Sequence, residues 1–113
     1  MTGHEIAENL RSSKLGWTTG QLHRKNPDTL EDEFCVLGLK AFEAGVSIKR
    51  LDTPWRLPEE LSLPISIVWH VNDSTYSVAG LRTKEAVADA FDSPSHRDVD
   101  YPIEAFIEWL KSH

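Results

Sequence analysis

The sequence predicts an all-α fold, namely a small single-domain bundle of about four principal helices around a central helix near residues 30–45. Residues 31–45 form the longest strongly periodic apolar segment, and residues 103–110 near the C-terminus repeat this helical pattern. A chain of 113 residues can bury one core without the help of a disulfide or a metal ion. We therefore treat residues 1–113 as a single helical domain, with room for one short extended segment.

The first helix is expected to begin at Thr2. Thr2 and Glu5 have the spacing of a capping box, in which each side chain accepts a hydrogen bond from the other residue's backbone amide. Ile6 and Leu10 would then face the core. The threonine, glycine, asparagine and proline residues between 17 and 28 predict a loop, with room for a short strand.

The central helix is expected to start after Asp28 or Thr29, either of which can cap its first amides, and to end at Gly45. The acidic residues at 31–33 would favour the positive end of the helix dipole. Gly38 lies in the middle of this helix, at a cost of about 1 kcal/mol relative to alanine. We interpret Gly38 as a position where another backbone packs closely.

The segment after the central helix is rich in proline. Three prolines indicate that no long helix runs through residues 46–64, although one helical turn is expected at Pro58. Residues 65–71, ISIVWHV, combine β-branched side chains with helical spacing, and we expect a short buried helix rather than a strand. Three polar residues are expected to close this helix as a turn: Asn72, Asp73 and Ser74.

Two more helices are expected towards the C-terminus. Thr83 is the predicted N-cap of a helix over residues 84–91. The last helix is expected to start near Pro102. Its apolar residues recur at the three- and four-residue steps of one helix face: Ile103, Phe106, Ile107 and Leu110.

The excess negative charge lies in the C-terminal quarter. The formal net charge is -6, and residues 85–108 hold seven acidic residues against one basic residue, Arg97. Direct DNA binding is not expected, because it requires a basic surface. The single cysteine, and the lack of a signal-like or membrane-length apolar run, predict a cytoplasmic protein with no membrane contact.

Several residues together resemble an uncharacterised family of small bacterial and phage proteins. The resemblance spans about residues 5–91 and consists of Gly16-Trp17, the segment 35–39 with Ala41 and Ala44, the pair Asn72-Asp73, and Thr83 with Val87. This resemblance implies a helical fold and implies no mechanism.

The acidic segment supplies the leading hypothesis for function, a non-enzymatic protein-interaction module. A surface of one charge sign steers an oppositely charged partner towards it, and tryptophan is a frequent interface anchor. We expect a phage protein that binds a host protein. The predicted partner-binding residues are five acids and two tryptophans: Glu85, Asp89, Asp92, Glu104, Glu108, Trp109 and Trp55.

An enzymatic alternative is a cysteine-dependent hydrolase or transferase. Cys35, His70 and Asp73 could act as nucleophile, base and orienting acid. A cysteine on an apolar helix face is more often simply a small buried hydrophobe. We therefore rank this hypothesis below the interaction module.

A weaker alternative is a DNA-binding helix-turn-helix, because residues 41–48 show the alanine and glycine spacing of its turn. A recognition helix that begins at Ser47 would meet Asp52 and Pro54 within two turns, and it would carry little positive charge. The five histidines are scattered, and none pairs with another ligand at zinc-site spacing, so neither a metal nor another cofactor is expected.

Overall fold

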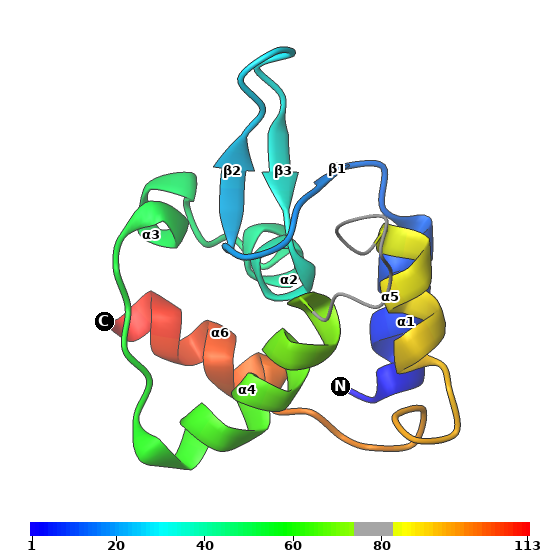
Figure 1. Cartoon of the computed structure of the whole chain (residues 1–113). Helices are drawn as coiled ribbons and strands as arrows, with labels where there is room; N and C mark the ends of the chain where they lie inside the picture. Colours follow the sequence, from blue (N-terminus) through cyan, green and yellow to red (C-terminus); the bar gives the residue numbers. More distant parts are fainter. Residues whose placement is uncertain (74–82) are drawn as a thin grey trace.

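The computed structural model describes residues 1–73 and 83–113, and there it combines six helices with a small mixed sheet (Figure 1). The elements are α1 (Gly3–Ser12), β1 (Gly16–Trp17), β2 (His23–Lys25), β3 (Asp32–Phe34), α2 (Val36–Glu43), α3 (Ile48–Asp52), α4 (Glu59–Asp73), α5 (Lys84–Phe91) and α6 (Ile103–Ser112). The expectation of an all-α fold with about four principal helices is therefore wrong. The protein is an α/β mixture that is mostly helical.

The sheet has the strand order β1-β3-β2, and β3 runs parallel to β1 and antiparallel to β2. Strand β3 occupies residues 32–34, which were expected to lie in the first turns of the central helix. Opposite charges explain the pairing, since Lys25 lies opposite Asp32 and Arg24 opposite Glu33, with 3.5 Å between the Arg24 and Glu33 side chains. These acidic residues therefore stabilise a hairpin instead of a helix dipole.

The hairpin turn also removes the two expected helix caps. The Asn26 side-chain oxygen accepts hydrogen bonds from the backbone amides of Asp28 and Thr29, at 2.8 and 3.1 Å. The actual N-cap of α2 is Cys35, whose sulfur accepts from the Gly38 amide. The central helix is thus only eight residues long, from Val36 to Glu43.

Both predictions for the glycines of this region are confirmed. A methyl group on Gly38 would overlap the backbone carbonyl of Leu22, so α2 packs directly on the chain that leads into β2. Gly45 has a φ of 97° and follows the last turn of α2, where its amide donates to the Phe42 carbonyl. The Val46 amide donates to the Ala41 carbonyl, which completes a Schellman motif.

Helix α4 is longer than the sequence predicted, because it runs from Glu59 through Pro64 to Asp73. Proline in a helix interior removes one hydrogen bond and costs about 3 kcal/mol. Burial of the α4 face that contains Ile65, Val68 and Val71 offsets that cost. The expectation of a helix at 65–71 is confirmed, whereas the expected break at Pro64 is wrong. Asn72 and Asp73 belong to this helix, and Ser74 lies outside the described residues.

Helices α1, α5 and α6 start where the sequence predicted, whereas the short helix α3 was not expected in the preferred interpretation. Thr2 and Glu5 form both bonds of the capping box of α1, and the Thr83 hydroxyl accepts from the Ala86 amide at the start of α5. Helix α6 follows Pro102 directly. Helices α1 and α5 lie side by side (Figure 1).

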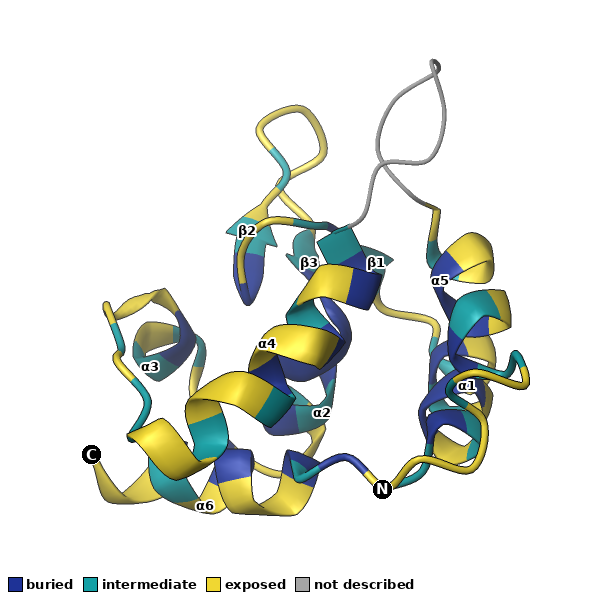
Figure 2. Ribbon diagram, turned by 60° about the horizontal axis from the view of Figure 1, so that its bottom comes forward, coloured by how far each residue is buried: buried dark blue, intermediate teal, exposed yellow. Residues whose placement is uncertain are grey.

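Helix α2 is the centre of the fold, as expected, although it is short. It contacts α4, α6 and β3, and its buried face joins a core that includes Phe34, Phe91 and Phe106. Figure 2 shows α4 across the near side of the molecule, with an exposed outer side. Among the helices of residues 1–73 and 83–113, none is long and apolar enough to cross a membrane.

Candidate functional site: a tryptophan groove beside helix α4

Two hollows in the surface share one pair of tryptophans, Trp55 and Trp69. The first hollow, of about 680 Å³, lies between residues 55–57 and α4 and is lined by Ser62 and Ser66. The second, of about 560 Å³, lies between residues 20–23 and the end of α3. Both hollows are lined by both tryptophans, and we call the two together the tryptophan groove.

The two indole rings are fixed by aromatic packing. Trp55 follows Pro54 in the segment between α3 and α4, and its ring meets Trp69 edge-on with 6.2 Å between centroids. On another side the ring of Trp55 packs edge-on against the fully buried Phe106 of α6, at 5.6 Å. Both tryptophans are half-buried, so each is held by the core and also exposes part of its ring.

Each hollow also contains one carboxylate. Glu59, in the first turn of α4, lines the first hollow together with Arg56, and Asp52, the last residue of α3, lines the second. A carboxylate beside an aromatic face suits a lysine or arginine side chain, because both attract a cation. The groove can therefore take an apolar side chain and a basic one next to each other.

His23 forms one wall of the second hollow. Its Nδ1 lies 2.7 Å from Asp52 and its Nε2 lies 2.8 Å from Asp32, so the protonated imidazole can donate to a carboxylate from both ring nitrogens. Burial alone lowers the pKa of His23, but the hydrogen bonds to Asp32 and Asp52 and the charges of these carboxylates together outweigh it, and the pKa is raised. His23 thereby joins β2 and β3 to α3 and fixes that wall.

The contacts of His23 with Asp32 and Asp52 predict that the stability of the fold depends on pH. Because the pKa of His23 is raised above 6.5, its contribution is complete below about pH 6.5 and is lost as the pH rises through the folded-state pKa. Urea unfolding from pH 5.5 to 9 should therefore show a stability advantage of the wild type over His23→Gln that shrinks as the pH rises. An advantage that stays constant over this range would contradict a cationic His23.

The structure does not assemble the predicted cysteine site. Cys35 is fully buried, and burial raises the pKa of its thiol to about 12, although the amides of Gly38 and Leu37 partly oppose this. His70 is exposed on α4. Asp73 accepts from the Gly20 amide and from Asn72, at 2.9 and 2.7 Å. Cys35 therefore stays a protonated, inaccessible thiol near neutral pH.

The structure also divides the predicted acidic face. Asp89 and Asp92 lie on the side of α5 that meets α1, where Arg11 binds both, each at 2.9 Å. Glu85 is exposed on α5. Glu104 and Glu108 are exposed on α6, which lies apart from α5 (Figure 1), and Glu104 is 3.3 Å from the N-terminal amine. These acids do not form one continuous surface.

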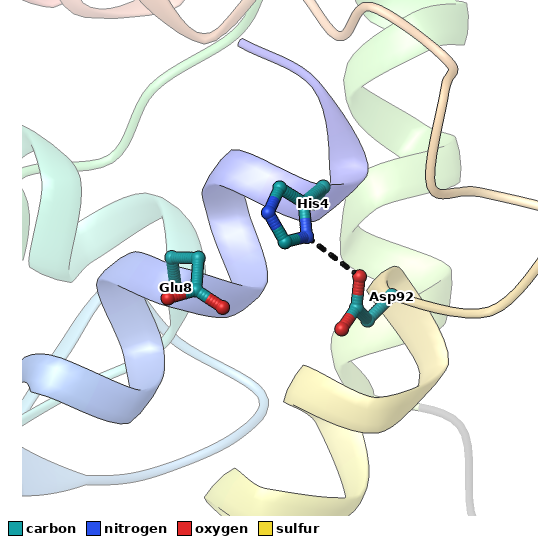
Figure 3. Close-up of side chains that lie close together, drawn as sticks. All are labelled: His4, Glu8 and Asp92. Carbon is teal, nitrogen blue, oxygen red and sulfur yellow. Dashed lines mark hydrogen bonds and ion pairs between the residues drawn. The ribbon is translucent and has the colours of Figure 1, made fainter.

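Asp92 is the centre of an ion-pair network between α1 and α5. It binds His4, Arg11 and Arg97, and its hydrogen bonds to His4 and Arg11 lower its pKa to about 2. Figure 3 shows His4, Glu8 and Asp92 with ligand atoms close enough to surround one ion. Arg11 lies 3.5 Å from Glu8, and Arg97 lies 2.7 Å from Asp92. The guanidinium groups of Arg11 and Arg97 therefore border this cluster and would repel a metal cation. We interpret the cluster as a structural network.

The two predicted tryptophan anchors lie in different surroundings. Trp109 stacks on His113 at 4.8 Å, and the Arg50 guanidinium lies 5.6 Å from its ring. Trp55 instead belongs to the tryptophan groove. Trp69 and Asp52 were not predicted as groove residues. The sequence signal that could have indicated the groove is the pair Pro54 and Pro58, which keeps the segment around Trp55 out of a helix.

No protein-family model matches this chain, and no curated protein or solved structure shows significant similarity to it. The resemblance to a family of small bacterial and phage proteins therefore stays a prediction. What the protein does has to be inferred from its own surface.

Proposed function

We propose that this protein is a non-enzymatic interaction domain that binds a segment of a partner protein in the tryptophan groove. The observation that carries this proposal is that one packed pair, Trp55 and Trp69, borders two hollows of about 680 and 560 Å³. Their volumes fall within the range of ligand-binding clefts, and both are open to solvent, as suits a peptide segment laid across the surface. Tryptophan anchors are among the side chains that contribute most to binding energy at protein interfaces.

The chemistry of the groove favours a particular kind of segment. Exposed indole surface suits an apolar group, while Glu59 suits a lysine or arginine; Asp52 is already paired with His23. The net charge of -6 would also attract a basic partner. We therefore expect the bound segment to combine an aromatic or aliphatic residue with a basic one.

The two alternative functions have less support. A cysteine enzyme needs an accessible thiolate, whereas the pKa of Cys35 is raised to about 12 by burial. A helix-turn-helix needs a recognition helix that reaches into a DNA groove, whereas α3 has five residues and ends at Asp52. Binding of a peptide in the tryptophan groove requires neither a reactive thiol nor a long recognition helix.

The proposal is tested by selection from a random 12-residue peptide library displayed on phage, with the purified domain as bait. Peptides that combine apolar and basic residues should be enriched. Their binding should be lost in Ser66→Arg, which fills the first hollow from an exposed helix position. The matched control is Ser12→Arg, because Ser12 is also an exposed helix serine but lies on α1 and does not line the groove.

Binding by the wild type and by Ser12→Arg, together with at least about tenfold weaker binding by Ser66→Arg, would support the proposal. Circular dichroism would establish that both variants are folded. Two results would overturn it: no enrichment of any peptide, or enriched peptides that bind Ser66→Arg as tightly as the wild type.

A further inference from the structure

A second surface of α4 lies beside the tryptophan groove. Four exposed residues follow one another at steps of three, four and three along the helix, and we call them the α4 stripe: Glu60, Leu63, Ile67 and His70. This spacing is the one by which paired helices contact each other. Leu63 and Ile67 are 71% and 44% exposed, and Leu63 is the most exposed large hydrophobic residue of the described chain.

The α4 stripe is complementary to itself in one orientation. If two copies of α4 lie antiparallel about a two-fold axis near residue 65, Leu63 of each copy faces Ile67 of the other. The same axis places Glu60 of each copy opposite His70 of the other. An apolar centre is then flanked at both ends by an acid and an imidazole, which can form a hydrogen bond or an ion pair.

We propose that the occupant of the α4 stripe is a second copy of this chain, bound antiparallel through a two-fold axis. A two-fold interface requires a patch that is complementary to itself, and the order acid, leucine, isoleucine, histidine satisfies this requirement in both its apolar and its polar contacts. In a parallel pair with equivalent residues aligned, each glutamate would instead face the other glutamate, which is destabilising.

The dimer leaves the tryptophan groove open. From α4 the groove is lined by Glu59, Ser62, Ile65, Ser66 and Trp69. Ser62, Ile65 and Trp69 point away from the α4 stripe, whereas Glu59 and Ser66 lie at the border between the two surfaces. Figure 2 shows that the outer side of α4 is free of other described elements of the chain. One dimer would therefore present two grooves, but dimer formation itself does not depend on a ligand in either groove.

The size of the contact sets the expected affinity. Only one helix of 15 residues from each copy takes part, which is small compared with the roughly 1,200–2,000 Å² of a stable protein interface. We therefore expect a reversible dimer that dissociates on dilution. Sedimentation equilibrium of the full chain at several concentrations measures the dissociation constant directly.

Four variants test the arrangement. Leu63→Lys places charge in the apolar centre and should raise the dissociation constant by at least about tenfold. Glu60→Lys places a lysine opposite His70, and His70→Glu places two acids opposite each other, so each should weaken the dimer. The double variant Glu60→Lys/His70→Glu restores opposite charges across the axis and should recover the wild-type dissociation constant to within about threefold.

Circular dichroism controls for folding, and all three positions are exposed. Recovery in the double variant would establish both the second copy as occupant and the antiparallel register. The proposal is overturned if the wild type stays monomeric at every concentration, if the single charge variants dimerise like the wild type, or if the double variant dimerises no better than either single variant.

Discussion

Replacing Gly38 by alanine is expected to lower the free energy of unfolding by about 3 kcal/mol or more. The added Cβ would lie 2.6 Å from the carbonyl carbon of Leu22 and closer still to its oxygen. Both contacting groups are backbone, because Gly38 belongs to α2 and Leu22 directly precedes β2. Neither can turn aside as a side chain can, so the helix and the sheet would have to separate.

Gly45→Ala is the matched control for this prediction. Gly45 has a φ of 97°, but an added methyl group would meet no atom within 4 Å beyond its chain neighbours. The substitution should therefore cost only about 1 kcal/mol, through backbone conformation alone. Urea unfolding of both variants measures the difference. Equal losses at positions 38 and 45 would contradict direct backbone packing at Gly38.

Features that depend on neighbouring residues could be predicted from the sequence. The capping box at Thr2, the cap at Thr83 and the left-handed stop at Gly45 each require residues within a few positions of one another. Gly38 was predicted for a different reason, because a mid-helix glycine is costly without a packing role. The caps and the stop are confirmed because local chemistry determines them. The prediction for Gly38 is also confirmed, but its packing partner, Leu22, could not be named from the sequence.

Features that depend on distant pairing could not be predicted in the same way. Residues 32–34 have apolar and acidic neighbours that suit a helix start, and only their partner strand at residues 23–25 makes them a strand. The sequence does contain a signal for this hairpin, because the basic residues 23–25 are separated by a polar turn from residues 32–34, which include two acids. In α4, core burial outweighed the local preference of Pro64 to break a helix.

A second large effect is expected at Asn72, which is 1% exposed at the end of α4. Its side-chain oxygen accepts from the Val36 amide at 2.9 Å, and its side-chain nitrogen donates to Asp73 at 2.7 Å. The Asn72 side chain therefore accepts from a backbone N–H that has no partner within α2, and it also donates to a carboxylate of α4. It joins the two helices that support the core and the tryptophan groove.

Asn72→Asp should cost about 3 kcal/mol at pH 7, because it buries a negative charge beside Asp73 and removes the donor. The buried position and the adjacent carboxylate would raise the pKa of the new acid, so the loss should diminish as the pH falls and the acid becomes protonated. Urea unfolding at pH 7 and pH 5 measures this.

Asn72→Ala provides the comparison, because it also removes the side-chain contacts but introduces no charge. Its cost should be about 2 kcal/mol and should change little between the two pH values. If Asn72→Asp were as stable as the wild type at pH 7, Asn72 would not be the buried link between α2 and α4.

The candidate site could be predicted only in part. Trp55 was expected to be an interface anchor, and it lies in the tryptophan groove. The helical spacing of Glu85, Asp89 and Asp92 predicted one outward face, but it contains no information about Arg11, which lies on α1 and binds Asp89 and Asp92. A helical pattern shows which residues share a face but not which element covers that face.

The most direct test of binding in the tryptophan groove uses the indole N–H signals of the four tryptophans. The ¹⁵N-labelled protein would be titrated with a selected peptide and followed by nuclear magnetic resonance. We expect large shifts at Trp55 and Trp69, which line both hollows, and small shifts at Trp17 and Trp109, which line neither. Shifts that are largest at Trp109 or Trp17, with Trp55 and Trp69 unchanged, would contradict the account and place the binding site elsewhere.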